Sequence, residues 1–141
     1  MKSDKTVIEV SALINASIEE VWSRWTTPDD ILRWNNASDD WHTTKAENDL
    51  RTGGHFLSRM EAKDGSFAFD FAGIYDLVLE HKYIEYTIAD GRKVTVTFET
   101  EGRTTKITEL FEAEDFHTAE QQFEGWQAIL DNFKSYVLSR V

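Results

Sequence analysis

The segment TAEQQFEGWQAILDNFKSYVLSR, residues 118–140, decides the fold of this chain. Its large apolar side chains recur at steps of three and four residues, which predicts one amphipathic helix. These side chains are Phe123, Trp126, Ile129, Leu130, Phe133, Tyr136 and Val137. At about 1.5 Å per residue such a helix spans about 30 Å, enough to cross a small sheet. A helix of this length that closes a sheet leaves either a packed core or a cavity beneath it.

The segment from Trp41 to Glu114 is predicted to form strands joined by tight turns. Dipeptides that favour two-residue hairpins and other reversals punctuate it. The turn signals are Asp64-Gly65, Asp90-Gly91, Glu101-Gly102, Arg51-Thr52-Gly53-Gly54 and Glu80-His81-Lys82. The strands expected between them are residues 41–48, 55–63, 66–79, 83–89, 92–100 and 103–114. Because each hairpin reverses the chain, these strands form an antiparallel sheet.

Residues 7–34 are predicted to form one strand and two short helices. Apolar residues alternate along the strand, at Ile8, Val10, Ala12 and Ile14. Ser17 and Glu20 have the spacing of a capping box, in which Ser17 accepts from the Glu20 N–H and the Glu20 carboxylate reaches back to the cap. The second helix begins with Thr27 as its cap and Pro28 at its first position.

The predicted order is strand, two short helices, six strands and one long helix, which is an α+β fold. An antiparallel sheet with one apolar face must cover that face. The helix of residues 118–140 is wide enough to do so, and the two short helices can close one end of the sheet. Gly73, in the middle of the longest strand, suits a bend or bulge that curls the sheet. We therefore expect a curved, seven-stranded antiparallel sheet around a long C-terminal helix.

Composition limits the class of protein and of partner. A chain of 141 residues is expected to form a single domain over residues 1–141. A net charge of −11 argues against nucleic acid or an anionic membrane surface as a partner. The absence of cysteine from the sequence removes disulfides and thiolate zinc sites. Residues 1–10 lack the apolar stretch of a signal peptide, and no apolar run approaches the roughly 20 residues of a membrane helix. We expect a cytoplasmic protein without membrane insertion, monomeric or homodimeric.

Short motifs along most of the chain give a resemblance to a known family. They are residues 17–22 (SIEEVW), Thr27-Pro28 with Leu32 and Trp34, residues 49–54 (DLRTGG), Gly73-Ile74-Tyr75, residues 94–98 (VTVTF) and Gly125-Trp126 with Leu130, Phe133 and Tyr136. In this order they resemble the branch of the START/Bet v 1-like (SRPBCC) superfamily named after the activator of Hsp90 ATPase. The chain departs from the family at Asn35-Asn36, where members often carry a second Trp and a Pro.

This resemblance implies a helix-grip fold, in which the seven-stranded sheet grips the long helix and a cavity separates the two. It implies little about activity, because the superfamily includes lipid and hormone carriers, polyketide cyclases, toxin-resistance proteins and a co-chaperone domain. Candidate cavity residues are Trp34, Trp41, Phe69, Phe71, Tyr75, Glu109, Trp126 and Phe133. Aromatic side chains fill a core as readily as they line a pocket, and the resemblance makes the two interpretations about equal for most of these. Trp34 and Trp41 flank a polar loop and are candidates for a lid.

Glu109 has two interpretations. It shares a strand face with Thr105, Ile107 and Phe111. If that face is turned to the helix, a buried carboxylate with a raised pKa could act as a general acid or orient a polar ligand group. The interpretation that we favour from the sequence is that Glu109 pairs with a cation such as Arg59 or Lys106, or turns outward.

Other polar residues also have a structural interpretation. Asp49 and Arg51 are expected to pair across a turn in which Gly53 and Gly54 supply positive φ, in preference to Arg51 serving as an anion clamp. Histidines occur at His42, His55, His81 and His117, without metal-ligand spacing, so no metal or cofactor is expected. His42 and His55, on neighbouring strands, are the one pair that could meet.

The sequence favours a binding function over catalysis. Neither a nucleophile elbow nor a phosphate loop nor a dinucleotide fingerprint is present in the sequence. The leading hypothesis is therefore a protein that holds a small hydrophobic or amphipathic molecule between sheet and helix. One alternative is a polyketide cyclase-like enzyme, in which Glu109 or a tyrosine moves protons. A second alternative is an Hsp90 co-chaperone-like interaction module, which predicts an exposed apolar patch instead of a cavity.

Overall fold

The structure is a computed structural model that describes residues 6–140 of the chain. Within these residues three helices and seven strands follow one another in the predicted order. The strands are β1 (Val7–Ile14), β2 (Trp41–Asn48), β3 (His55–Ala62), β4 (Ala68–Leu79), β5 (Tyr83–Ile88), β6 (Lys93–Glu101) and β7 (Thr104–Glu112). The helices are α1 (Ile18–Thr26), α2 (Pro28–Trp34) and α3 (Ala119–Leu138). The predicted bounds of the last six strands and of α3 differ from these by no more than two residues.

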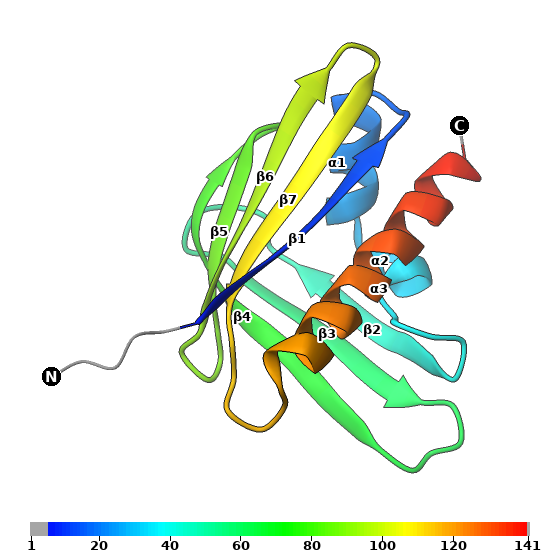
Figure 1. Cartoon of the computed structure of the whole chain (residues 1–141), viewed down its shortest axis with the longest axis vertical. Coiled ribbons are helices and arrows are strands. Elements are labelled where there is room, and N and C mark those ends of the chain that lie inside the picture. The colour runs from blue at the N-terminus through cyan, green and yellow to red at the C-terminus, as the bar shows by residue number, and fades with distance from the viewer. Residues whose placement is uncertain (1–5, 141) are drawn as a thin grey trace, which may run out of the picture.

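All seven strands form one antiparallel sheet in the order β1-β7-β6-β5-β4-β3-β2. The hairpins predicted from the turn dipeptides produce the consecutive part of this order, and β1 adds beside β7. The sheet is curved, and α3 crosses one face of it, with α1 and α2 at one end (Figure 1). The α+β fold with a gripped C-terminal helix is therefore confirmed. No helix within residues 6–140 is long and apolar enough to cross a membrane.

The buried stripe of α3 differs from the predicted one at its start. Leu130, Phe133 and Val137 are fully buried, but Phe123 is 42% exposed. Gln122 takes the inward position of the first turn instead, because its amide holds the preceding loop. Its Oε1 accepts from the Glu114 N–H at 2.9 Å, and its Nε2 donates to the carbonyl oxygens of Glu114 and His117 at 3.1 and 2.9 Å. The inclusion of Phe123 in the apolar face was wrong for this reason.

The predicted helix caps are formed in part. Ser17 accepts from the Glu20 N–H at 3.2 Å, as expected. The Glu20 carboxylate does not complete the box, because it accepts from Arg24 Nε at 2.6 Å. Thr27 stands at the start of α2 without a side-chain cap bond, since its hydroxyl donates to the Ser23 carbonyl at 2.7 Å. A complete capping box is present at the start of α3, where the side chains of Thr118 and Gln121 each accept a hydrogen bond from the other's backbone N–H.

A polar junction ties the three helices together at one end of the sheet. Arg24 of α1 pairs with the buried Asp30 of α2 at 3.2 Å, and the Tyr136 hydroxyl of α3 donates to the same carboxylate. The indole Nε1 of Trp34 donates to the Arg24 carbonyl at 2.9 Å. Asn132 of α3 donates to the Trp34 carbonyl at 2.7 Å. These bonds fix α2, and the Trp34 ring with it, against α3.

Gly73 is required by close packing on both sides of β4. A Cβ atom there would lie 2.4 Å from the Thr87 carbonyl oxygen and 2.9 Å from the ring of Phe56. The irregularity of β4 comes later, between Tyr75 and Leu77, where the register with β5 shifts. The predicted bulge is therefore present in the longest strand, two to four residues beyond the glycine.

Candidate ligand-binding cavity

A cavity of about 350 Å³ lies among the sheet, α3 and the ends of the two short helices. Six of the eight candidate residues line it, namely Trp34, Phe69, Phe71, Tyr75, Glu109 and Trp126. The inward face of β4 is thus the one that carries Phe69, Phe71 and Tyr75, which the sequence left open. The inner wall is buried, and Phe69 and the exposed Glu47 lie at its rim.

Phe133 and Trp41 do not belong to the lining. Phe133 is 0% exposed and packs edge-on against Trp25 at 4.9 Å and Trp34 at 4.8 Å between ring centroids. It is part of the core that closes one end of the cavity. Trp41 packs against Phe67 and Phe69, each at 6.0 Å between centroids. It therefore supports the rim residue Phe69 from outside the cavity.

Aromatic rings form much of the wall. Phe56 of β3 meets Tyr86 edge-on at 4.8 Å and Tyr75 at 5.2 Å. On the helix side, Trp126 stacks on Phe111 at 3.9 Å with an interplanar angle of 9°. This stack fixes the indole plane, because a ring held face-to-face by the sheet cannot rotate without losing the contact. The cavity therefore has packed aromatic walls on the sheet side and on the α3 side.

Glu109 of β7 is buried in this wall, with 4% of its surface exposed. Its register neighbours are Val10 on β1 and Val96 on β6, so no polar side chain flanks it along the sheet. Burial raises the pKa of Glu109 from 4.5 to about 8. Within residues 6–140 the Glu109 carboxylate has no hydrogen bond or ion pair that would offset the cost of burying its charge.

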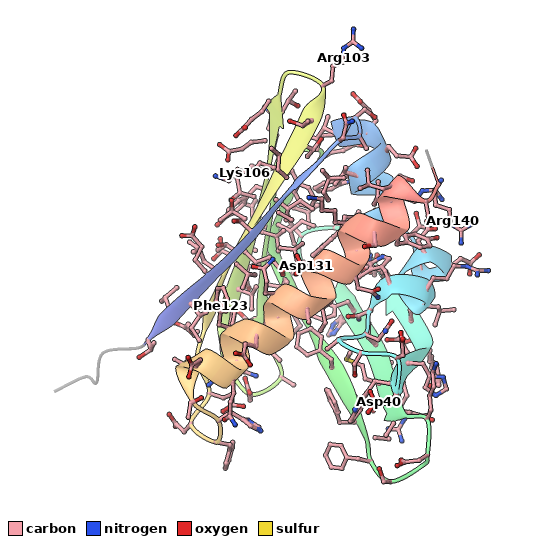
Figure 2. All side chains as sticks on the ribbon, turned by 45° about the vertical axis from the view of Figure 1, so that its right-hand side comes forward. Asp40, Arg103, Lys106, Phe123, Asp131 and Arg140 are labelled. Atoms are coloured by element: carbon pink, nitrogen blue, oxygen red, sulfur yellow. The ribbon has the colours of Figure 1, made fainter. Side chains whose placement is uncertain are left out.

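Neither of the cations favoured from the sequence pairs with Glu109. Arg59 pairs with Asp70 at 3.1 Å and with Glu61 at 3.3 Å. Lys106 lies on the face of the sheet turned away from α3 (Figure 2). The favoured interpretation of Glu109 was therefore wrong, and the less favoured one, an inward carboxylate, describes its position.

Two tyrosines supply further polar groups to the cavity. Burial raises the pKa of Tyr86, and the charge of Glu109 raises it further. The Tyr75 hydroxyl donates to Asn48 Oδ1, and Asn48 Nδ2 donates to the Thr26 carbonyl at 2.7 Å. Burial also raises the pKa of Tyr75, so both hydroxyls stay neutral near pH 7. The Tyr86 hydroxyl can therefore donate a hydrogen bond to a ligand, whereas the Tyr75 hydroxyl, whose one proton is given to Asn48, can only accept one.

The sequence pattern contained a signal for some lining residues that were not singled out. Ser58 and Met60 of β3 and Tyr86 of β5 are buried and alternate with half-buried residues of the same strand, so strand parity alone turns them inward. No local signal marks Arg92, which follows a turn and reaches the cavity rim through its long side chain. Its guanidinium binds Asp90 at 2.9 Å and the Glu112 carbonyl at 3.3 Å.

Comparison with known proteins assigns a family to this architecture. The model of the family described as "Activator of Hsp90 ATPase homolog 1-like protein" matches residues 15–138. The chain belongs to this family. It is thereby a member of the SRPBCC superfamily, and the resemblance inferred from the motifs is confirmed.

Solved structures of similar proteins share the fold of this family member. An AHSA1-like protein from Aeromonas hydrophila is 47% identical with a TM-score of 0.90, over 96% of this chain and 94% of its own. A protein from Cytophaga hutchinsonii is 48% identical with a TM-score of 0.80, over 98% and 94%. The protein CV1439 from Chromobacterium violaceum, 20% identical with a TM-score of 0.83 over 93% and 96%, shares the fold. No curated protein matches the chain.

The departure from the family pattern at Asn35-Asn36 has a structural role. Asn35 lies at the cavity rim, and Asn36 Oδ1 accepts from Asn132 Nδ2 of α3 at 3.2 Å. The Asn36 amide thus connects the end of α2 to α3. The rim beside Trp34 is polar as a result.

The loop of the family motif at residues 49–54 is structural. Arg51 pairs with Asp49 at 3.0 Å, and Gly53 has a φ of +87°. Gly54 is needed for a different reason, because a Cβ atom there would lie 2.0 Å from the Asp49 carbonyl oxygen. The expected ion pair is confirmed, whereas positive φ applies to Gly53 and not to Gly54.

The histidines do not assemble into a site. His42 lies opposite Glu61 at the far end of β3 from His55, so this pair does not meet. His117 contacts Glu114 at 2.6 Å, and His81 occupies a turn with a φ of +64°. Within residues 6–140 there is no group of three or more His, Asp or Glu side chains that could hold a metal ion.

Proposed function

We propose that this family member binds a small hydrophobic or amphipathic molecule in the cavity between the sheet and α3. The observation that carries the proposal is a cavity of about 350 Å³ that has aromatic walls and contains one buried, unpaired carboxylate. This volume lies in the range of small-molecule sites, which combine apolar walls with a few polar groups. The Trp126–Phe111 stack supports the proposal, because a pre-formed wall lowers the cost of ordering on binding.

The energetics indicate an amphipathic ligand more than a purely apolar one. A ligand that buries about 200 Å² of apolar surface gains about 5 kcal/mol. Costs of association reduce this gain, so apolar contact alone gives affinities near the millimolar range. A polar contact with Glu109 or Tyr86 is needed for micromolar binding.

Calorimetric titration with fatty acids, sterols and flat aromatic compounds tests the proposal. We expect at least one class to bind with micromolar affinity at one molecule per chain. A Ser58→Phe variant, which places a ring in the cavity, should lose this binding at least tenfold. Thr97→Phe makes the same kind of change on the outer face of β6 and should retain it. Thermal unfolding of both variants checks that they fold, and equal binding by both would contradict the proposal.

A cyclase-like proton-transfer enzyme is the second candidate, and the buried position of Glu109 favours it. The ionised Glu109 carboxylate would first remove a proton from the α-carbon of a polyketide-like substrate, which leaves an enolate. As the enolate carbon attacks a second carbonyl carbon, protonated Glu109 would give the proton to that carbonyl oxygen, which forms the carbon–carbon bond and an alcohol and restores the carboxylate. Glu109→Gln should then abolish turnover while binding persists. Turnover that survives this substitution would exclude the role.

A further inference from the structure

We propose, building on the ligand-binding function proposed above, that the cavity takes an amphipathic organic cation whose ammonium group contacts Glu109 and whose apolar part contacts the aromatic walls. The starting point is a carboxylate that faces a cavity without a protein partner. When such a carboxylate is ionised, its strongest partner is a cation with which it forms a charge-assisted hydrogen bond. The protein supplies no such cation among residues 6–140, so the ligand is the remaining source.

The charged groups around the cavity favour a cation over an anion. Glu109 of β7, Glu47 of β2 and Glu114 beyond β7 all line it; Glu47 pairs with Lys45 at 3.1 Å and Glu114 with His117 at 2.6 Å, which leaves Glu109 as the unpaired carboxylate of the three. One guanidinium, that of Arg92, lines it as well, and it is already bound to Asp90 and a backbone carbonyl. The titratable groups that face Glu109 from β4 and β5 are Tyr75 and Tyr86, both neutral. The lining residues from α3, Trp126 and Ile129, carry no charge, and the register neighbours on β1 and β6 are valines.

The walls also suit a cation. Aromatic faces attract ammonium groups through the ring quadrupole, and the attraction increases when the cation is desolvated. Tyr86, Phe71 and Trp126 all line the cavity, and Phe71 meets Trp126 edge-on at 6.2 Å. The same rings provide apolar contact for the rest of the ligand. A carboxylate next to aromatic rings is thus complementary to an amine attached to a flat or branched apolar group.

The competing ligand is a neutral molecule that accepts a hydrogen bond from protonated Glu109. Burial raises the pKa of Glu109 to about 8, so most molecules carry a protonated Glu109 at pH 7. A cation that needs the carboxylate must displace this proton, and at pH 7 it therefore binds about tenfold more weakly than it would bind ionised Glu109. The two ligand classes therefore have opposite pH dependence. Binding of a cation releases a proton and strengthens as pH rises from 6.5 to 8.5. Binding of a neutral acceptor is independent of pH below 8 and weakens above it.

A matched ligand series distinguishes these classes. The probes are 1-naphthylmethylamine, 1-naphthylmethanol and 1-naphthoate, which share a ring and differ in charge. Calorimetry at pH 7, in buffers of different ionisation enthalpy, measures affinity and proton release for the wild type, Glu109→Gln and Glu99→Gln. Glu99 lies on the outer face of β6, so its substitution makes the same chemical change away from the cavity.

We expect the amine to bind the wild type at least tenfold more tightly than the alcohol, with release of close to one proton. Glu109→Gln should abolish this preference, and Glu99→Gln should keep it. Equal or tighter binding of the alcohol or the naphthoate would overturn the inference while leaving the proposed function in place. A preference that persists in Glu109→Gln would also overturn it. Absence of binding by all three probes at millimolar concentration would count against both the preference for a cation and the proposed ligand-binding function.

Discussion

At the scale of single residues, Glu109 links the cavity to the pH dependence of stability. Its pKa is about 8 in the folded protein against 4.5 ordinarily. Between these values the folded state holds a proton that the unfolded state has lost, so stability falls as pH rises. The loss is about 1.4 kcal/mol per pH unit, up to an upper bound near 5 kcal/mol. Above pH 8 this contribution is constant.

Glu109→Gln should remove this dependence, because glutamine does not ionise. We expect the stability difference between the variant and the wild type to grow by several kcal/mol in favour of the variant as pH rises from 5 to 9. Urea denaturation at four pH values in this interval measures the difference. The same comparison for Glu99→Gln, at an exposed position, serves as the control. A wild-type minus Glu109→Gln difference that does not change with pH would mean that the carboxylate is solvated.

Two glycines make a second comparison at this scale. Gly73→Ala should destabilise the protein by about 2 kcal/mol or more, because the new Cβ meets the Thr87 carbonyl oxygen at 2.4 Å. Gly125→Ala in α3 has open space around its Cβ, and alanine is the better helix former. It should stabilise by about 0.5 to 1 kcal/mol. Chemical denaturation of both variants gives the two values, and the same sign for both would show that backbone contacts do not control these sites.

Strand parity placed Glu109 on one face with Thr105, Ile107 and Phe111, but it showed neither which way that face points nor what surrounds it. The alternation of Thr105, Ile107 and Phe111 was visible in the sequence. Whether Arg59 could reach Glu109 depends on strand order and sheet face. In the structure Arg59 is on β3, four strands away from β7, and is bound to Asp70. Pairing across non-adjacent strands is a tertiary property that residue spacing does not encode.

At the scale of elements, α3 protects the edge of the sheet. β1 is an edge strand, and an unpaired edge leaves N–H and C=O groups exposed. Gln127 of α3 covers part of this edge, since its Nε2 donates to the Ser11 carbonyl at 3.0 Å and its Oε1 accepts from the Ser11 N–H at 3.4 Å. One side-chain amide thus replaces a missing strand at this residue.

Gln127→Ala should cost about 1 to 2 kcal/mol, because both Ser11 backbone groups lose their partner. It should also speed hydrogen exchange of the Ser11 amide more than that of amides at the centre of the sheet. Denaturation and amide exchange measured by NMR test both effects. Glu124→Ala, on the exposed side of the same helix, is the control and should be near neutral. Unchanged exchange at Ser11 would contradict the role of Gln127.

The elements that the sequence located best are those with strong local signals. Asp-Gly turns and alternating apolar residues placed the hairpins, because both reflect short-range backbone preferences. The first turn of α3 was less predictable. Gln122 is buried by bonds to the backbone of Glu114 and His117, and hydropathy ranks it as a surface residue. The periodicity of apolar residues does not identify a buried polar residue, such as Gln122, that binds a loop to a helix.

At the scale of the whole molecule, the architecture was predictable and the cavity was not. Element order, hairpins and one amphipathic helix restrict the chain to a sheet that grips a helix. A cavity of about 350 Å³ is a small difference between the space under α3 and the volume of the side chains in it. Phe133 fills that space and Trp126 borders it, although both belong to the same helical face. Only their positions relative to α2 and the sheet separate the two roles.

The central claim, that the space under α3 is a ligand site, has one direct test. NMR spectra of the chain with isotope-labelled isoleucine and leucine methyl groups and tryptophan indoles would be followed during titration with 1-naphthylmethylamine. A ligand site under α3 predicts saturable shifts at Ile84, Ile129 and Trp126, which line the cavity, and none at the exposed Leu79 of β4. Shifts that are absent at the lining residues, or that appear only at exposed ones, would contradict it.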